Sequence, residues 1–315
     1  MTRIIKDIDT AVKEIMNGNV IGLPTETVYG LAANALNENA VMKIFETKDR
    51  PRFNPLIVHV SGTDAFEMYG ENIPDDVYSL AEKFSPGPIA YIVKKKKVIP
   101  DITTAGNDSV ALRIPSHEMF REVLLKSGVP LAAPSANRSG KISPTSAEDV
   151  LSELEGKINY ILDGGRCEVG IESTVISFID GEARILRYGA VTKKEIEDVI
   201  GKTVHGNSGK LVSPGQLKSH YAPMTPLYIL DDPTELKNIK DNKMGVLDFS
   251  VYNNVKEIAL NLYSDLSKLD KMNYDIIVCS KVDDEGLGIA INDRLERASS
   301  GKVKFEDNEI KIITE

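Results

Sequence analysis

The sequence is poor in cysteine. Its 315 residues include only Cys167 and Cys279, which lie far apart and form no C-x-x-C pair. A disulfide framework or a structural zinc site needs several cysteine or histidine residues at close spacing. Both are therefore disfavoured, and the low cysteine content indicates a reducing compartment.

Long apolar runs are also missing. No segment approaches the roughly 20 apolar residues that cross a membrane as a helix. The first residues, Met1-Thr-Arg-Ile-Ile-Lys, lack the apolar region of a signal peptide. We therefore expect a cytoplasmic protein that does not associate with membranes.

The sequence also lacks a surplus of basic residues. The chain has 38 Lys and Arg against 47 Asp and Glu, a formal net charge of −9. Proteins that coat nucleic acids normally carry a basic surplus. The one basic run, Lys94 to Lys97, follows an apolar segment and is typical of a strand that ends in solvent.

Several familiar catalytic signatures do not occur. There is no G-x-G-x-x-G dinucleotide fingerprint and no G-x-S-x-G nucleophile turn. Ser139-Gly-Lys resembles the end of a P-loop, but Ser135 and Ile142 stand where the loop needs glycine and Ser or Thr. The four histidines have no metal-ligand spacing. A Rossmann dinucleotide site, a hydrolase triad and a metal centre are all disfavoured.

Short apolar runs rich in branched residues dominate the first two hundred positions. They predict strands near residues 20–23, 56–60, 89–93, 110–114, 160–162, 174–179 and 184–187. Helical patterns separate some of these runs, and Thr192 with Glu195 predicts a capped helix over 193–200 that stops at Gly201. The sequence therefore predicts an α/β fold with a mixed sheet.

The composition and the periodicity of the sequence change after Gly201. Residues 202–226 have no periodicity and many turn formers, which is typical of a linker. Beyond it, apolar runs near 227–230 and 274–279 alternate with helical patterns, the last over about 286–300. We predict a catalytic domain over 1–201, a linker over 202–226 and a smaller Rossmann-like α/β domain over 227–315.

Polar clusters stand where several predicted strands begin or end. In the first cluster, Lys48, Arg50 and Arg52 lie within five residues, with Pro51 between the arginines and Pro55 after them. A solvated loop explains the charges alone, but the two prolines stiffen the segment and suggest a pre-ordered anion site. The other four clusters lie around residues 109–115, 132–145, 170–176 and 185–190. Turn chemistry or a solvated sheet face is the alternative at each. Together they indicate an anion- or nucleotide-binding enzyme without a nucleophile–base pair.

Six segments, taken in order, resemble the YrdC-like threonylcarbamoyl-AMP synthases. They are Pro24-Thr-Glu-Thr-Val-Tyr-Gly-Leu, Lys48-x-Arg-Pro-x-x-Asn-Pro-Leu, Leu112-Arg-Ile-Pro, Pro134-Ser-Ala-Asn, Glu172-Ser-Thr-Val and Leu186-Arg-Tyr-Gly. The linker Ser213-Pro-Gly-Gln-Leu-Lys-Ser-His-Tyr-Ala-Pro and the segment after it resemble the two-domain form of this family. The resemblance covers nearly the whole chain and implies a YrdC-like twisted mixed sheet.

The resemblance also implies a reaction. L-threonine, bicarbonate or CO2, and ATP yield L-threonylcarbamoyl-AMP, pyrophosphate and water, for N6-threonylcarbamoyladenosine synthesis in tRNA. Mg²⁺ would be held mainly by the phosphates, with no metal ligand from the protein. The implied partners are these small substrates and, transiently, the downstream tRNA threonylcarbamoyl-transferase machinery, without strong direct tRNA binding.

The site residues follow from the matched motifs. The threonine site would be lined by Thr27, His59, Arg113, Ala133 and Ser173, with Arg113 as the partner of the carboxylate. The ATP site would be formed by Lys48, Arg50, Asn54, Ser109, Ser135, Ser143, Arg187 and Tyr221. Lys48 and Arg50 would assist catalysis at the phosphates. Tyr221, in the linker, would close over the nucleotide as part of a lid. Glu26 is a less certain participant, because buried turn carboxylates often only cap backbone amides.

Two other functions remain open at this point. A non-catalytic YrdC-like module could bind tRNA or the ribosome through the same cations. The net charge and the lack of aromatic platforms for bases count against it. Carbamoyl transfer from carbamoyl phosphate ranks lower, because the chain lacks the acylphosphatase-like and zinc-finger segments of the enzymes that perform it.

Overall fold

The chain divides into two compact units. The computed structural model describes residues 1–179, 181–206, 220–239, 243–306 and 309–313. One unit comprises Met1–Ser139 and Pro144–Gln216, and the other comprises Gly140–Ser143 and Leu217–Glu315. The short stretch Gly140–Ser143 therefore groups with the second unit, although it lies inside the range predicted for the first domain. Most of the predicted linker, 207–219, lies outside the described residues.

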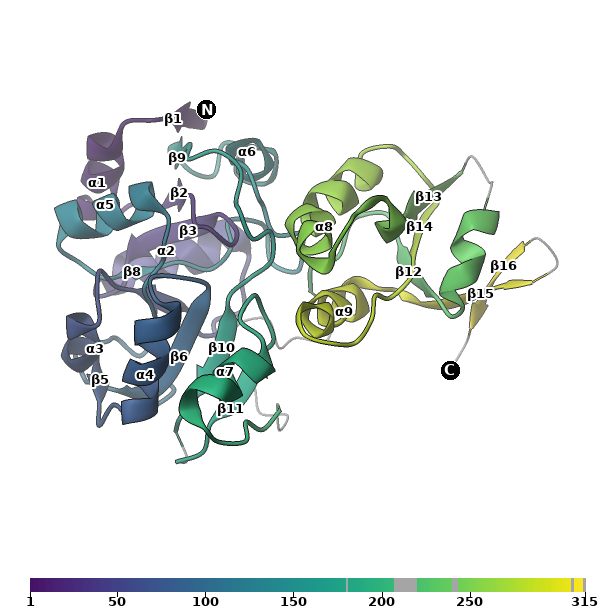
Figure 1. The fold of residues 1–315 in the computed structure, drawn as a ribbon. Coiled ribbons are helices and arrows are strands. Elements are labelled where there is room, and N and C mark those ends of the chain that lie inside the picture. Colours follow the sequence, from purple (N-terminus) through teal and green to yellow (C-terminus); the bar gives the residue numbers. More distant parts are fainter. Residues whose placement is uncertain (180, 207–219, 240–242, 307–308, 314–315) are drawn as a thin grey trace. The chain divides into compact units, whose positions relative to one another are not determined.

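A large mixed sheet forms the centre of the first unit (Figure 1). Its strands follow the order β1-β9-β2-β3-β8-β4-β7-β6-β10-β11, and β5 pairs with β6 at the side. Pairs β4–β7 and β6–β10 are parallel, whereas β6–β7 and β10–β11 are antiparallel. The strands are β1 (Arg3–Ile5), β2 (Ile21–Leu23), β3 (Gly30–Asn34), β4 (Ile57–His59), β5 (Gly70–Glu71), β6 (Ile89–Lys95), β7 (Ser109–Arg113), β8 (Leu131–Ala132), β9 (Tyr160–Leu162), β10 (Thr174–Ser177) and β11 (Arg184–Arg187).

Helices lie against this sheet. They are α1 (Ile8–Met16), α2 (Glu38–Lys48), α3 (Asp64–Tyr69), α4 (Asp75–Phe84), α5 (Glu118–Ser127), α6 (Ala147–Leu154) and α7 (Lys193–Ile200). The predicted helix over 193–200 is confirmed: Thr192 and Glu195 form a reciprocal capping box, and Gly201 ends α7 with a φ of 64°. Ser146 and Asp149 cap α6 in the same way.

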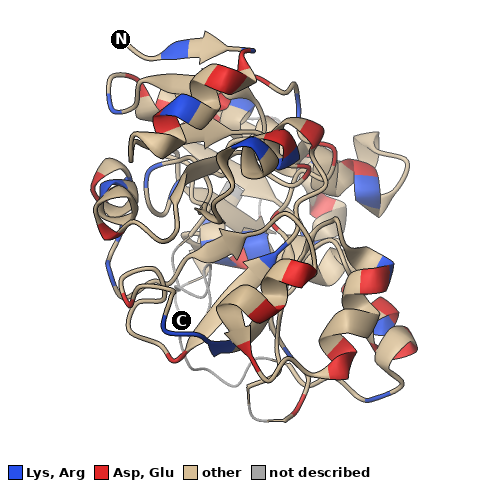
Figure 2. Ribbon diagram, turned by 90° about the vertical axis from the view of Figure 1, so that its left-hand side faces the viewer, with Lys and Arg blue, Asp and Glu red and all other residues tan. Residues whose placement is uncertain are grey.

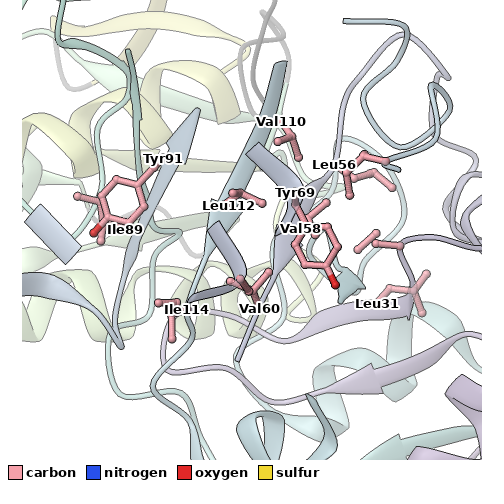
Figure 3. Packing of buried hydrophobic residues seen from close by; sticks show 14 of the residues in the cluster. Leu31, Leu56, Val58, Val60, Tyr69, Ile89, Tyr91, Val110, Leu112 and Ile114 are labelled. Carbon is pink, nitrogen blue, oxygen red and sulfur yellow. The ribbon is translucent and has the colours of Figure 1, made fainter. Parts of the chain in front are cut away.

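Alternation along the strands separates a core face from a polar face. Val58 of β4 and Val110 and Leu112 of β7 point into the main hydrophobic cluster, which Figure 3 shows from close by. Because neighbouring residues of a strand point to opposite faces, His59 and Arg113 lie on the other side. Packing of the core therefore determines which polar side chains share a face.

The second unit has a smaller sheet in the order β13-β14-β12-β15-β16. All neighbouring pairs are parallel except β15–β16. The elements are β12 (Leu227–Leu230), β13 (Met244–Leu247), β14 (Ile276–Cys279), β15 (Gly301–Glu306), β16 (Glu309–Ile313), α8 (Val255–Asp270), α9 (Leu287–Ala298) and the 3₁₀ turns η1 (Pro233–Asn238) and η2 (Phe249–Val251). The predicted fold class, a large mixed sheet with helices and a second, smaller α/β unit, is confirmed.

Charged residues of both signs are interspersed along the helices (Figure 2). In the described part of the chain, no helix is long and apolar enough to cross a membrane.

Candidate active site

The polar face of the large sheet brings together His59 and Arg113. β4 and β7 run parallel, and these two residues are direct register partners although they are far apart in the sequence. Both are almost completely buried. Ser109 lies on the same face at the start of β7, where it is partly exposed. Two residues predicted for the threonine site therefore lie side by side.

An apolar cluster lies on this same face. It consists of Ile57, Ala90, Ile92, Ala111, Val175 and Leu186, which belong to β4, β6, β7, β10 and β11. These side chains are distinct from the main core cluster. The face therefore combines the buried guanidinium of Arg113 and the imidazole of His59 with an apolar floor, a combination suited to a small ligand that has charged and apolar parts.

The turn Thr25–Thr27 contacts Arg113 directly. Nη2 of Arg113 donates to Oε1 of Glu26 at 2.7 Å and to Oγ1 of Thr27 at 3.0 Å. Nε of Arg113 donates to the carbonyl oxygen of Gly87 at 3.3 Å. Within the described chain, these bonds leave the two N–H groups of Nη1 without a protein partner. Nη1 is therefore the part of the guanidinium that can receive a substrate carboxylate.

Thr25 sets the direction in which the hydroxyl of Thr27 bonds. Oγ1 of Thr25 lies 2.6 Å from the carbonyl oxygen of Val28, a contact that uses its only proton. In the 2.8 Å contact between the two threonine hydroxyls, Thr27 is then the donor. Oγ1 of Thr25 also accepts from the backbone N of Thr27 at 3.1 Å and from that of Val28 at 3.2 Å. Thr27 accepts from Arg113 and has one lone pair left. It can therefore accept a hydrogen bond from a ligand ammonium or hydroxyl.

His59 is held in its neutral form. Burial, together with the positive charge of Arg113, lowers the pKa of His59 from 6.5 to about 3. Its ring lies 5.1 Å from the ring of Phe120, and Nδ1 is buried without a hydrogen-bond partner among the described residues. An unpartnered buried polar atom is costly, so Nδ1 indicates a place where a ligand or water bonds.

The ammonium of Lys48 is directed into the protein. Nζ donates to the carbonyl oxygens of Ser135 and Asn137 and lies 3.4 Å from Oδ1 of Asn137. Burial, and then the positive charge of Arg50, lowers the pKa of Lys48 well below its usual value. Lys48 therefore fixes the loop Ser135–Asn137 in this structure. Its predicted role at the phosphates stays a prediction.

Arg50 and Asn54 organise the neighbouring loop. Nε of Arg50 donates to the carbonyl oxygen of Asn54 at 3.3 Å, and Nη2 donates to that of Pro55 at 3.1 Å. Asn54 is buried, and neither atom of its side-chain amide has a partner in the part of the chain described. Both a donor and an acceptor of this amide are therefore available to a water or a polar ligand.

Ser173 and Arg187 form a buried pair. Nε of Arg187 donates to the carbonyl oxygen of Ser173, and Nη2 donates to its Oγ, both at 3.0 Å. Gly189 lets the next turn approach this segment: a Cβ at this position would lie 2.4 Å from the backbone N of Thr174. The Leu186-Arg-Tyr-Gly motif therefore includes a glycine because no larger residue fits.

The loop after β8 holds three further residues of interest. The backbone N of Ala133 donates to Ile57 at 3.1 Å, so Ala133 is fixed beside β4. Oγ of Ser135 donates to Oδ1 of Asn137 at 2.5 Å. Asn137 is not among the predicted site residues, although it lies in the quoted Pro134-Ser-Ala-Asn motif. The available signal was its place in that motif, two residues after the predicted ATP-binding Ser135.

Ser143 and Tyr221 belong to the second unit, unlike the other predicted site residues. Their segments lie side by side, because the backbone N of Ala222 donates to Gly140 at 2.9 Å. The ring of Tyr221 stacks on Tyr263 with centroids 5.7 Å apart. The predicted contact of Tyr221 with a nucleotide stays a prediction, and residues 207–219 of the predicted lid lie outside the described chain.

These features define a mixed α/β protein with a buried site for a polar, charged small molecule. Among the described residues, no group of three or more His, Cys, Asp or Glu is arranged to hold a metal ion. The first unit offers guanidinium, amide, hydroxyl and imidazole groups instead. Such a set can bind and orient anionic and zwitterionic substrates.

The comparisons with known proteins identify the family. The Sua5/YciO/YrdC family model, described as "Telomere recombination", matches residues 13–189. A second model, described as "Threonylcarbamoyl-AMP synthase, C-terminal domain", matches residues 191–300. The chain belongs to the Sua5/YciO/YrdC family in its two-domain form, and the resemblance inferred from the six motifs is confirmed.

Relatives and a solved structure cover nearly the full length. The chain is 39% identical to the threonylcarbamoyl-AMP synthase of Pyrococcus abyssi, over 92% of this chain and 93% of the relative. It is 38% identical to that of Bacillus subtilis, over 92% of each. The crystal structure of P. abyssi Sua5 complexed with L-threonine matches with a TM-score of 0.89 and 36% identity, covering 97% of this chain and 100% of that one.

Proposed function

We propose that this protein is an L-threonylcarbamoyladenylate synthase. It forms L-threonylcarbamoyl-AMP and pyrophosphate from L-threonine, bicarbonate or CO2, and the magnesium complex of ATP. Family membership and the names of relatives along almost the whole chain support this activity. Among the structural features, the arrangement of Arg113, Thr27 and His59 supports it most directly.

The proposed threonine pocket matches the ligand group by group. Nη1 of Arg113 offers two donors for the carboxylate, and Oγ1 of Thr27 offers an acceptor for the amino group. Nδ1 of the neutral His59 is a buried polar atom without a partner among the described residues. We propose that this atom bonds to the threonine hydroxyl. The bound threonine structure of the P. abyssi relative supports placing the same amino acid here.

The chemistry needs no covalent enzyme intermediate. The amine of threonine attacks the carbon of CO2, loses a proton and becomes a carbamate. A carbamate oxygen then attacks the α-phosphorus of ATP, and the bond to the β-phosphate breaks as pyrophosphate leaves. When bicarbonate is the carbon source, its dehydration gives the water. Positioning of reactants and stabilisation of charge provide the catalysis.

Seven of the residues proposed to contact ATP are divided between the two units. Arg50, Asn54, Ser109, Ser135 and Arg187 lie in the first unit, and Ser143 and Tyr221 lie in the second. The unpartnered amide of Asn54 supports a polar ligand at the Arg50 loop. Mg²⁺, bound by the phosphates, would neutralise the leaving pyrophosphate. Lys48 would act by holding Ser135 and Asn137 in place.

We infer that the product is consumed by a cytoplasmic tRNA threonylcarbamoyl-transferase machinery. A carbamoyl-phosphate anhydride hydrolyses readily, which favours direct and transient transfer to the consuming enzyme. The domain arrangement of 1–201, 202–226 and 227–315, with the linker as a lid that excludes water, belongs to the same proposal.

Pyrophosphate release by the purified chain tests this function. The assay contains ATP, Mg²⁺ and bicarbonate, with L-threonine, L-serine, L-alanine or no amino acid. Release that depends on L-threonine, with a product that contains both AMP and threonine, is expected. Release that ignores threonine, or tight tRNA binding without any release, would overturn the proposal and favour an RNA-binding module.

A further inference from the structure

Glu26 is a buried carboxylate beside the proposed threonine pocket. Its side chain and that of Arg113 are each 5% exposed, and Oε1 accepts from Nη2 of Arg113 at 2.7 Å. A carboxylate in such a place is costly unless it is paired and hydrogen-bonded. The reaction steps above assign it no proton transfer and no contact with the phosphates. The residues that hydrogen-bond to Glu26 therefore indicate its role.

Two other chain segments fix Glu26. Oε2 accepts from the backbone N of Ser116 at 3.2 Å. The backbone oxygen of Glu26 accepts from the backbone N of Val169 at 2.8 Å. Both of these bonds are independent of the guanidinium of Arg113. The carboxylate is therefore a fixed point against which the longer and more flexible arginine side chain can be oriented.

Arg113 is oriented by the acceptors around it. Glu26 and Thr27 take the two N–H groups of Nη2, and Gly87 takes that of Nε. A guanidinium is planar, so fixing Nε and Nη2 also fixes the direction of Nη1. Without Glu26, the strongest of these contacts would be lost and a buried positive charge would be unpaired.

We propose that Glu26 is a positioning residue for substrate binding: it holds Arg113 so that Nη1 faces the carboxylate of the amino acid. This inference rests on the proposed function, which places threonine at Arg113. The ion pair also leaves this part of the pocket without net charge. A neutral pair of opposite charges suits a zwitterionic amino acid better than a simple anion, because it offers an anion no net positive charge.

A double-mutant cycle between Glu26 and Arg113 tests the proposal. Glu26→Gln removes the charge at nearly constant volume, and it should raise the KM for threonine about 10-fold or more, as for other disrupted buried charge pairs. The KM for ATP should change by less than a factor of two. Because Glu26 acts through Arg113, adding Glu26→Gln to Arg113→Ala should cause no further rise. Threonine binding measured by calorimetry should follow the same pattern.

Two further variants separate positioning from folding. Glu26→Asp keeps the charge and should recover part of the threonine affinity that Glu26→Gln loses. Asp149→Asn removes a carboxylate that caps α6, where it accepts from Ser146, and it serves as the matched structural control. It should lower the melting temperature without changing the KM for threonine.

The outcomes distinguish this inference from the proposed function. A wild-type enzyme with threonine-dependent release, together with an unchanged threonine KM in Glu26→Gln, would overturn the role of Glu26 alone. Fully additive effects in the double variant would overturn it as well, since they show that Glu26 does not act through Arg113. A wild-type chain that neither binds threonine nor releases pyrophosphate with it would contradict the proposed function and this role together.

Discussion

Arg187 donates two hydrogen bonds to Ser173, one to its carbonyl oxygen and one to its hydroxyl, both at 3.0 Å. Arg187 is proposed to contact ATP and Ser173 to contact threonine, so this pair joins the two binding sites. The sites should therefore not behave as independent pockets. Arg187→Ala should raise the KM for threonine as well as for ATP, whereas Arg50→Ala should raise mainly that for ATP.

Steady-state kinetics with each substrate varied in turn measures this difference. Ser173→Ala removes the hydroxyl and keeps the carbonyl contact, so its effect on ATP should be smaller than that of Arg187→Ala. An Arg187→Ala enzyme with a normal KM for threonine would show that the pair does not couple the sites.

The amide of Asn54 should be costly for stability and useful for binding. It is buried, and both of its polar atoms lack partners among the described residues. Asn54→Leu, which has a similar volume, should keep or raise the free energy of unfolding by about 1 kcal/mol, because it removes unsatisfied polar atoms. The same variant should raise the KM for ATP. Urea unfolding and kinetics on one preparation give both values, and a clear loss of stability would indicate an undetected structural bond.

The hydroxyl of Thr25 should control the hydrogen bonding of Thr27. Thr25→Val keeps the shape but removes the atom to which Thr27 donates, together with the acceptor for the backbone N of Thr27 and of Val28. The Thr27 proton would then turn toward the pocket, where it opposes a ligand ammonium. We expect the KM for threonine to rise about 10-fold, which corresponds to about 1.4 kcal/mol. Thr25→Ser keeps the hydroxyl and is the matched control, with threonine kinetics near those of the wild type.

Gly189 should tolerate no side chain. A Cβ there would lie 2.4 Å from N of Thr174 and 2.5 Å from the carbonyl carbon of Ser173, both backbone atoms that cannot turn aside. Gly189→Ala should lower the free energy of unfolding by about 1–3 kcal/mol and displace Ser173. Gly62→Ala is the control, since a Cβ at Gly62 meets nothing within 4 Å. Equal stability of the two variants in urea would contradict the close approach.

His59 should make stability depend on pH. Burial lowers its pKa to about 3 in the folded protein, below the value of 6.5 in the unfolded chain. Between these values the unfolded state binds more protons, so stability rises with pH and is lost as pH falls below 6.5. His59 can contribute at most about 1.4 kcal/mol per pH unit to this slope. Unfolding free energies at pH 5 and pH 7 should differ less in His59→Gln, and an unchanged difference would show that His59 is not the cause.

The sequence predicted the elements with the clearest local signals. The helix over 193–200 has its cap, its stop and its amphipathic pattern between Thr192 and Gly201, and these local bonds suffice to define it. In the first unit, helices α1, α3 and α4 were missed, although Val77, Leu80 and Ala81 have helical spacing. Strand β8, the short apolar strand expected before the loop of residues 132–145, has only two residues, and its pairing with β3 and β4 defines it.

What the sequence by itself determined is the alternation within each strand and the residue types of each motif. Apolar Val58 and Leu112 had to face a core, which left His59 and Arg113 on the opposite face. Only the tertiary structure decided that these two residues are neighbours, because the register of β4 against β7 depends on packing between segments far apart in the sequence. The tertiary structure also decided the contact between Glu26 and Arg113 and the hydrogen bond from Thr27 to Thr25. Both depend on distances between atoms, which the order of residues in the sequence does not specify.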